Sequence, residues 1–195
     1  MPLLRRRPPP WDATADDEEL AARAQGGDRA AFGALYDRHL PRVHGYCRRL
    51  LGGREAAEDA TTEVFMRALA ALPAYRAGAF RPWLFAIAHN VVATELRRRR
   101  PTVPLAEAAG VADRGPSPEE LAAVAAERSA VLALLPRLSA DQQHVVALRL
   151  AGLSAAEIGA VLGKPRNAVD GLQHRALLRL RALVAVGGAP AKGGG

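Results

Sequence analysis

Polar side chains of the kinds that contact nucleic acid recur at helical spacing toward the C-terminal end of the sequence. Three of them share one face of a helix with Gly171, by i, i+3, i+4 and i+7 spacing: Asn167, Asp170 and His174. Amide, carboxylate and imidazole groups can exchange hydrogen bonds with base edges in a DNA groove. The stretch 149–181 also holds six Arg or Lys residues against two acids, a surplus that favours phosphate contacts. The pattern favours a DNA-binding surface over an αα-hairpin with a solvated charged face.

Two helices joined by a glycine turn are needed to present that surface. Ser154 and Glu157 have the spacing of a capping box, which predicts where the first helix begins, and Gly163 predicts where it ends. Pro165 suits the first turn of the second helix, because the N–H that proline lacks has no partner there. An apolar stripe predicts the buried face of the second helix: Val169, Leu172, Ala176, Leu180 and Leu183. The arrangement is that of a helix-turn-helix.

The second informative stretch is 80–100, FRPWLFAIAHNVVATELRRRR. Its predicted inner face consists of Trp83, Leu84, Ile87 and Val91. Six arginines and one acid lie between positions 76 and 100, and a basic helix that carries aromatic side chains suits melted nucleic acid. Two simpler interpretations stay open. One is that Trp83 is simply a core residue. The other is that the arginines at 97–100 form a solvated helix end, where the helix dipole favours positive charge.

Composition indicates a polyanionic partner. The net charge is +7 and 25 of the 27 basic residues are arginine, which favours bidentate contacts with phosphates and bases. The common phosphate-binding, hydrolase and zinc-protease motifs are missing, and His39, His44 and Cys47 come nearest to a ligand cluster. We interpret these three as structural, because Pro41 separates His39 from the others and Cys47 falls in an apolar stripe. We expect no catalytic residue, no metal and no cofactor.

Cysteine usage and hydropathy indicate the compartment. One cysteine excludes an internal disulfide framework and fits a reducing environment. Apolar runs stay below the roughly 18 residues that a membrane span requires. Prolines follow the arginines at 5–7 where a signal peptide would have an apolar segment. We expect a cytoplasmic protein with no membrane span.

Helical periodicity, interrupted by glycine and proline, predicts an all-α protein of two small helical domains joined by a flexible acidic linker. Five helices are expected in the first domain, over 16–26, from 28 to Pro41, from there to 51, over 55–72 and over 80–100. In the fourth helix, one set is predicted to face inward: Thr61, Val64, Phe65, Ala68 and Leu69. Beyond the linker, a helix over 119–135 and one capped by Ser139 precede the helix-turn-helix.

The predicted boundaries follow from these breaks. They are a disordered Arg/Pro tail over 1–15, a helical domain over 16–100, the linker over 101–120, a helix-turn-helix domain over 121–186 and a disordered tail over 187–195. The linker contains four prolines and no periodicity, and from 101 to 128 five acids outnumber two arginines.

The chain resembles the sigma-70 class of bacterial RNA polymerase sigma factors, in its small two-domain extracytoplasmic-function (ECF) group. EAAEDATTEVFMRAL, residues 55–69, resembles the helix that grips the polymerase clamp. The stretch 80–100 resembles the helix and loop of the sigma2 domain that melt and read the promoter -10 element. Residues 135–183 resemble the sigma4 domain, which reads the -35 element. The resemblance implies a sigma2-like helical bundle followed by a sigma4-like helix-turn-helix domain.

Site residues follow from the resemblance position by position. Those implied to bind polymerase are Asp59, Thr62, Glu63 and Arg67. Those implied at the -10 element are Trp83, His89, Asn90, Arg97 and Arg98, with Asn90 in the loop-like A-H-N as the candidate base contact. Those implied at the -35 element are Lys164, Arg166, Asn167, Asp170, Gly171, His174 and Arg175. The implied partners are core RNA polymerase and promoter DNA, with an anti-sigma protein as a further candidate.

Three departures from the family pattern stand out. Thr62 occupies a position where glutamine is usual, and Thr94 one where aspartate is usual. The run 170–173, Asp-Gly-Leu-Gln, stands where Lys-Ser-Arg-Leu is common. Asp170 can either accept a hydrogen bond from cytosine N4 and read a base, or repel phosphate and weaken binding.

Two other classes of protein remain as alternatives. A helix-turn-helix repressor or response regulator would explain 153–183, but it would leave 55–100 without a purpose. A nucleic-acid-modifying enzyme would need a catalytic constellation that this sequence lacks. Promoter-specific RNA in the presence of core polymerase discriminates a sigma factor from both.

Overall fold

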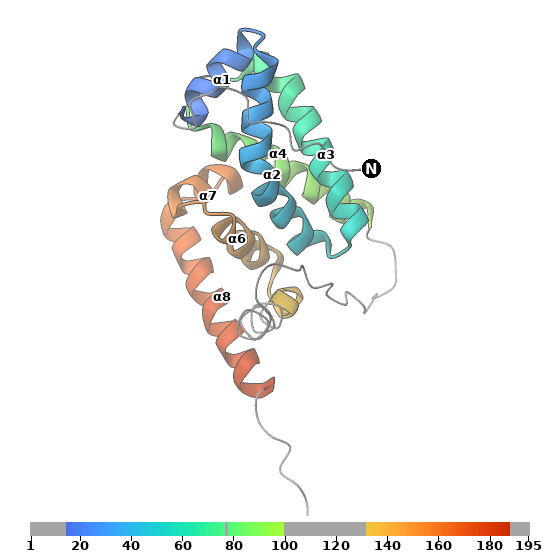
Figure 1. Cartoon of the computed structure of the whole chain (residues 1–195). Coiled ribbons are helices and arrows are strands. Elements are labelled where there is room, and N and C mark those ends of the chain that lie inside the picture. The colour runs from blue at the N-terminus through green and yellow to red at the C-terminus, as the bar shows by residue number, and fades with distance from the viewer. Residues whose placement is uncertain (1–14, 77, 100–131, 188–195) are drawn as a thin grey trace, which may run out of the picture.

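The computed structural model describes residues 15–76, 78–99 and 132–187, and the regular elements within those ranges are all helical (Figure 1). The first domain contains α1 (Asp17–Gln25), α2 (Arg29–Leu51), α3 (Arg54–Ala71), the 3₁₀ turn η1 (Leu72–Ala74) and α4 (Phe80–Arg98). The second contains η2 (Leu135–Arg137), α6 (Ala140–Leu150), α7 (Ala155–Leu162) and α8 (Arg166–Gly187). The all-α, two-domain prediction is confirmed. The predicted linker, most of both predicted tails and most of the helix predicted over 119–135 lie outside the described residues.

The first domain is built around α2, which contacts α1, α3 and α4. Its largest fully buried side chains come from all four helices: Leu20, Leu35, Tyr46, Val64, Phe80, Leu84 and Phe85. Asp28 caps α2 by accepting hydrogen bonds from the N–H groups of Ala30 and Ala31, both at 3.1 Å. Gly52, at a φ of 76°, ends the helix in a conformation that other residues rarely adopt.

Pro41 lies inside α2, so the break predicted at this position is wrong. Proline removes one N–H from the helix and crowds the preceding turn, at a cost of about 3 kcal/mol or more in a helix interior. Both halves of α2 are anchored by side chains at most 1% exposed, Leu35 and His39 before the proline and Val43 and Tyr46 after it. Burial on both sides therefore outweighs the local penalty.

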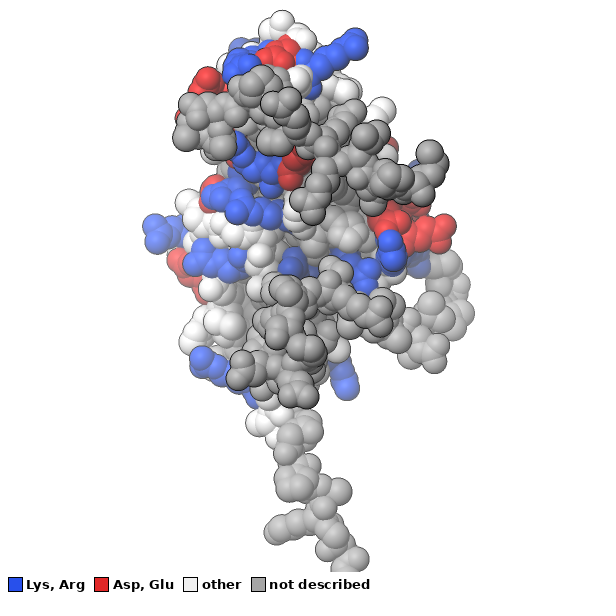
Figure 2. All heavy atoms as spheres, in the orientation of Figure 1, with Lys and Arg blue, Asp and Glu red and all other residues white. Residues whose placement is uncertain are grey.

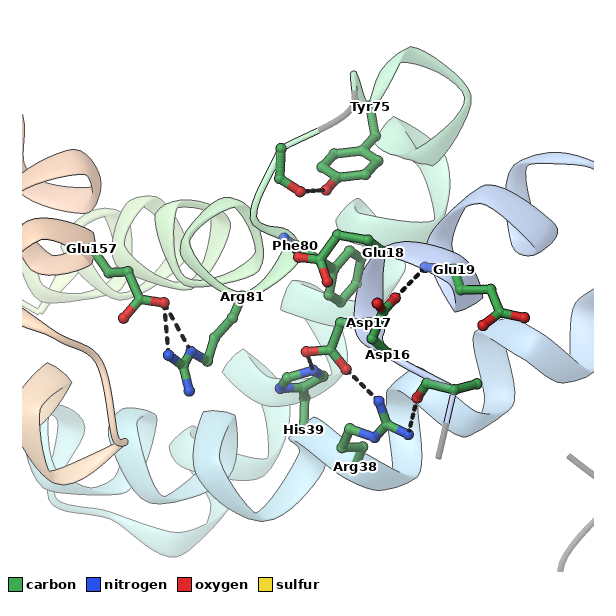
Figure 3. A network of polar contacts seen from close by, with 12 residues as sticks. Asp16, Asp17, Glu18, Glu19, Arg38, His39, Tyr75, Phe80, Arg81 and Glu157 are labelled. Carbon is green, nitrogen blue, oxygen red and sulfur yellow. Dashed lines mark hydrogen bonds and ion pairs between the residues drawn. The ribbon is translucent and has the colours of Figure 1, made fainter. Parts of the chain in front are cut away.

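Asp17 joins α1 to α2 through two side chains (Figure 3). Its carboxylate lies 2.7 Å from Arg38 Nη1 and 2.8 Å from Nε2 of the buried His39. Burial by itself would raise the pKa of Asp17, but the hydrogen bonds and charges of His39 and Arg38 outweigh it and lower the pKa to about 2. The pair is therefore a pH-dependent source of stability.

Replacing Asp17 with asparagine should reduce the free energy of unfolding at neutral pH by about 2 kcal/mol, since one pKa unit corresponds to about 1.4 kcal/mol. Because folding lowers this pKa, the stabilisation is complete above the ordinary value of 3.8 and is lost as the pH falls toward 2. The difference between the variant and the wild type should therefore shrink over that interval. Urea unfolding followed by circular dichroism measures it. Glu19→Gln, at an exposed acid of the same turn, is the control, and equal stability of Asp17→Asn and wild type at neutral pH would contradict the assignment.

Glu18 supplies the N-terminal cap of α4, which begins far away in the sequence (Figure 3). Glu18 Oε1 accepts a hydrogen bond from the backbone N–H of Phe80 at 3.1 Å. The N-cap residue of α4 is Ala79, whose methyl group cannot accept a hydrogen bond. The acidic start of α1 therefore fixes where the arginine-bearing helix begins.

The helix-turn-helix forms as its caps predict. Ser154 and Glu157 complete a capping box at the start of α7, and Gly163 ends that helix in the left-handed region, at a φ of 62°. Gly159 has a different role, because a Cβ there would lie 2.6 Å from the carbonyl oxygen of Lys164. The turn between α7 and α8 thus comes too close to α7 for any side chain at position 159. On α8, Val169, Ala176 and Leu180 are buried as predicted.

The two domains lie against each other, with α7 on α4 and α6 on α2 (Figure 1). One apolar core continues through both, since Phe85 and Val92 of the first domain belong to the same cluster as Val145, Leu148 and Ile158 of the second. The far part of α8 packs on a separate small core: Leu135, Leu138, Ala176 and Leu180. The sequence predicts both domains but not the contact between them.

Candidate nucleic-acid and polymerase interfaces

The outer surface of α8 carries most of the residues predicted to read the -35 element. Five of them are exposed: Arg166, Asn167, Asp170, His174 and Arg175. Gly171 is half-buried, and a Cβ there would lie 3.3 Å from the Arg175 guanidinium. The bare glycine therefore leaves room for Arg175 to lie along the helix surface.

Two cations of this surface are already paired with acids. Lys164 lies in the turn before α8, and its Nζ is 3.0 Å from Asp141 Oδ2 on α6. Arg166 Nε is 3.8 Å from Asp170 Oδ2, one helical turn away. Asp170 therefore has a partner on its own helix, and its charge offsets a cation that would otherwise be available to phosphate.

Replacing Asp170 with lysine should tighten binding to all -35 sequences and steepen the salt dependence, by about one unit for the added cation and by up to about one more for the released Arg166. Asp170→Ala should tighten binding less, with base preference unchanged. Affinity of the chain for a randomised -35 duplex pool at two salt concentrations, with core polymerase present, measures both effects. Relaxed preference at one base position in Asp170→Ala, by about 1–3 kcal/mol, would instead identify Asp170 as a base reader.

The predicted polymerase-binding residues lie on the exposed side of α3. Asp59, Glu63 and Arg67 are exposed, and Glu63 Oε1 accepts from Arg67 Nε at 2.6 Å. Thr62 is exposed as well, and its hydroxyl donates to the carbonyl oxygen of Glu58 at 3.0 Å. The prediction that Leu69 faces inward is wrong. Leu69 is 49% exposed because it lies at the edge of the apolar stripe, near the end of α3.

The acidic side of α3 and the end of α4 line a common groove of about 400 Å³. Asp59, Glu63 and Arg67 lie along it from α3, and Thr94 and Arg98 from α4. The groove therefore brings predicted polymerase-binding residues beside a predicted DNA-binding arginine. Sequence spacing contains no signal for this proximity, because the two sides come from different helices.

Helix α4 is continuous through Ala88-His89-Asn90, so the loop predicted there is wrong. The stretch contains no helix breaker after Pro82, which lies in the first turn where proline is tolerated. Asn90 is exposed on the helix, and its carbonyl oxygen accepts from the Thr94 hydroxyl at 2.9 Å. A base contact by Asn90 would therefore come from a rigid helix.

The other predicted -10 residues divide between the surface and the interior. Arg97 and Arg98 are exposed in the last turn of α4. Trp83 is half-buried, with its ring 4.9 Å from Tyr75 and 5.4 Å from Phe80 between centroids, and it packs against the core. Its ring is therefore at least partly a structural element, whereas its DNA contact stays a prediction.

His89 faces the second domain. Its Nδ1 lies 3.4 Å from the hydroxyl of Tyr46, and its ring centroid is 4.6 Å from that of His144 on α6. His89, one of the predicted -10 residues, thus contacts the helix-turn-helix domain. Sequence reasoning missed His144 as its neighbour because the two are 55 positions apart.

The charges visible on one face of the molecule are mostly basic. Figure 2 shows Lys and Arg side chains spread from the upper to the lower part of that face, with acidic side chains gathered in a few small clusters. Such a surface attracts a polyanion over distances of about a Debye length, roughly 8 Å at physiological salt.

His39 and Cys47 of α2 have structural roles. His39 is paired with Asp17, and burial raises the pKa of the Cys47 thiol to about 11, against a smaller opposing effect of its hydrogen bond with Thr61. Within the described ranges, no three His, Cys, Asp or Glu side chains gather where they could hold a metal. No helix in those ranges combines the length and the apolar character of a membrane span.

The helix-turn-helix shares one apolar core with a helical domain that carries exposed arginines. This combination is typical of a two-domain DNA-binding protein. Residues 35–102 match the family described as Sigma-70 region 2, and residues 128–180 match Sigma-70, region 4. The ECF RNA polymerase sigma factor BldN of Streptomyces coelicolor is 38% identical over 184 residues, which are 92% of this chain and 70% of BldN. ShbA of Streptomyces griseus, also an ECF sigma factor, is 38% identical over 186 residues, 88% of this chain and 97% of ShbA.

A solved structure of CnrH in complex with the cytosolic domain of CnrY is similar to this one. It superposes with a TM-score of 0.69 at 29% identity, covering 87% of this chain and 97% of CnrH, which comes from Cupriavidus metallidurans. The chain therefore belongs to the ECF RNA polymerase sigma factors, which direct promoter-specific initiation of transcription. A helix-turn-helix regulator independent of polymerase is not favoured, because it would leave the region 2 match over 35–102 unexplained.

Proposed function

We propose that this chain binds core RNA polymerase through the exposed side of α3 and promoter DNA through α4 and α8. The observation that carries the proposal is that the region 2 and region 4 matches fall on the two domains that present these exposed helices. On α3 the polymerase-facing residues are Asp59, Thr62, Glu63 and Arg67. On the other two helices the proposed DNA contacts are Trp83, His89, Asn90, Arg97, Arg98, Arg166, Asn167, Asp170, Gly171, His174 and Arg175, with Lys164 in the turn before α8.

The chain would open the promoter by binding bases that have left the DNA stack, without a catalytic step. A base that leaves a transiently open stack loses a few kcal/mol of stacking and pairing, which contacts with the protein must replace. Asn90 would contact such a base, while Arg97 and Arg98 hold the backbone. The polymerase synthesises RNA, so we assign no catalytic residue or cofactor to this chain and expect it to act in the cytoplasm, where the polymerase works.

The boundaries that we propose are a polymerase and -10 unit over 16–100 and a -35 unit over 121–186. An anti-sigma protein is a further proposed partner, supported by the solved complex of CnrH with the cytosolic domain of CnrY. Co-purification of the tagged chain from its own cells would test that partner.

Reconstitution tests the proposed function directly. Adding the purified chain to core polymerase on fragmented genomic DNA should yield discrete transcripts whose start sites share a -35 and a -10 element. Core polymerase alone is the control. Specific DNA binding without new transcripts would contradict the proposal and favour a regulator that is not a polymerase subunit.

A further inference from the structure

Within the part of the chain that the structure describes, polar groups join the two domains at two notable places. At the first, Arg81 of α4 donates to Glu157 Oε1 of α7, from Nη2 at 2.7 Å and from Nε at 3.2 Å (Figure 3). Both side chains are partly shielded, at 31% and 19% exposure. Glu157, which completes the capping box of α7, therefore also joins this helix to the first domain.

The second place is a cluster of one tyrosine and two histidines. Tyr46 of α2 is fully buried, and its hydroxyl oxygen lies 2.9 Å from Nδ1 of His144 on α6 and 3.4 Å from Nδ1 of His89 on α4. The imidazole rings meet edge to face, with their centroids 4.6 Å apart. The Nδ1 atoms of His89 and His144 thus share the hydroxyl group of Tyr46 as a partner.

Two mirror-image arrangements of protons satisfy all three groups, because in each the hydroxyl donates to one Nδ1 and accepts from the other. A tyrosine hydroxyl has one proton to donate and lone pairs with which to accept. If Tyr46 donates to Nδ1 of His144, it can accept from Nδ1–H of His89, and both imidazoles are then neutral. In this arrangement, protonating His144 places a proton on the nitrogen that had accepted, so the hydroxyl loses its acceptor, and in the mirror arrangement protonating His89 has the same effect. It also creates a cation in a buried site against a second imidazole.

The surrounding charges do little to compensate for such a cation. Asp141 of α6 is the acid that acts on both histidines, but it is already paired with Lys164 at 3.0 Å. Glu157 of α7 is paired with Arg81 of α4. From α8, the side chains in the shared core are the apolar Val169 and Leu172.

We propose that Tyr46, His89 and His144 form a proton-sensitive latch that holds the two domains closed while both imidazoles are neutral and releases α6 and α7 when they are protonated. In the closed arrangement α6 stands over His89, one of the proposed -10 residues. Opening would expose His89 and so favour promoter binding. This consequence rests on the proposed function, whereas the latch itself does not.

The pKa directions agree with the geometry. Burial, and then the charge of His89, lowers the pKa of His144 to about 4, and Asp141 opposes them. Burial also lowers the pKa of His89, again against Asp141. Because closing lowers these pKa values, the closed form is fully favoured above the ordinary value of 6.5 and loses that advantage as the pH falls toward 4. His144 alone should shift the ratio of open to closed chains about 30-fold between pH 8 and pH 5.

Distances between spin labels in the full chain test the latch without polymerase or DNA. Cysteines at the exposed positions Ala70 of α3 and Ala160 of α7 carry the labels, and the native Cys47 is fully buried. A narrow distance distribution at pH 8 should gain a longer component at pH 5, with helicity by circular dichroism unchanged. The same distribution at both pH values, with intact helicity, would overturn the proposal.

Three variants separate the latch from a general effect of acid. His89→Gln with His144→Gln retains side chains that can bond to Tyr46 but do not titrate, so the pH response should disappear. Tyr46→Phe retains the buried ring and removes the hydroxyl, so the longer component should already be present at pH 8. His44→Gln, on α2 beside Glu58, is the control and should respond as the wild type does.

Persistence of the full pH response in the double glutamine variant would overturn the latch. If that variant does not fold, a Tyr46→Phe chain that stays as closed as the wild type at pH 8 would overturn it equally. Because these measurements involve the chain alone, their failure is distinct from a failure to direct transcription with core polymerase.

Discussion

Reversing two charges on α3, by Asp59→Arg together with Glu63→Arg, should abolish binding to core RNA polymerase while leaving the helical fold intact. Both carboxylates are exposed, and Glu63 contacts Arg67 within one helical turn. Exposed pairs of this kind contribute only about 0.2–1 kcal/mol to stability, so the fold should tolerate the change. At an interface, in contrast, juxtaposed like charges cost several kcal/mol. Pull-down with core enzyme, alongside circular dichroism, measures both properties.

The matched control moves the same amount of charge elsewhere on the first domain. Glu19 of α1 and Asp37 of α2 are exposed acids outside the groove between α3 and α4. The double variant Glu19→Arg, Asp37→Arg should bind core polymerase as the wild type does. Equal affinity of the Asp59 and Glu63 variant would show that α3 is not the polymerase-binding side.

Removing two arginines at the end of α4, by Arg97→Ala and Arg98→Ala, should weaken promoter opening at every promoter. Phosphate contacts contain no base information, so the loss should be uniform in sequence. Each contact to duplex DNA contributes about 0.9 to the slope of log affinity against log salt, so the slope should fall by about 1.8. Permanganate footprinting of open complexes over a salt series measures the effect. Arg29→Ala, at an exposed position at the start of α2, is the control.

Asn90→Ala should behave differently from the arginine variants. The Asn90 amide is exposed on α4, about two turns before the arginines, and the variant would lose a base contact rather than a phosphate contact. Overall opening should then fall only at promoters that carry the preferred base at one -10 position. Unaltered base preference in Asn90→Ala would rule out this assignment, and a promoter-dependent loss in the arginine variants would rule out theirs.

Local chemistry explains which features the sequence predicts correctly. The helix caps at Ser139 and Ser154 and the helix end at Gly163 involve residues within three or four positions of one another. The apolar stripe of α8 depends only on helical spacing. Such features depend only on neighbouring residues, and the structure confirms them.

The wrong predictions come from places where packing overrules a local preference. Pro41 was expected to divide a helix, yet buried side chains on both sides keep α2 continuous. The A-H-N stretch of α4 was expected to form a loop, although Ala88 is fully buried in the core. Leu69 was assigned to the apolar stripe, but it lies at the edge of that stripe. In each case the outcome depends on which other helix covers the residue.

The sequence by itself determined the all-α class, the helix-turn-helix, the exposed polar face of α8 and the outward side of α3, because spacing within one helix decides all of them. Only the tertiary structure decided which polar groups of different helices meet. Lys164 with Asp141, Arg81 with Glu157 and His89 with His144 lie 23, 76 and 55 positions apart. No periodicity links such residues. They meet because the apolar sides of α6 and α7 are buried against α2 and α4, and that burial carries the polar groups beside it into contact.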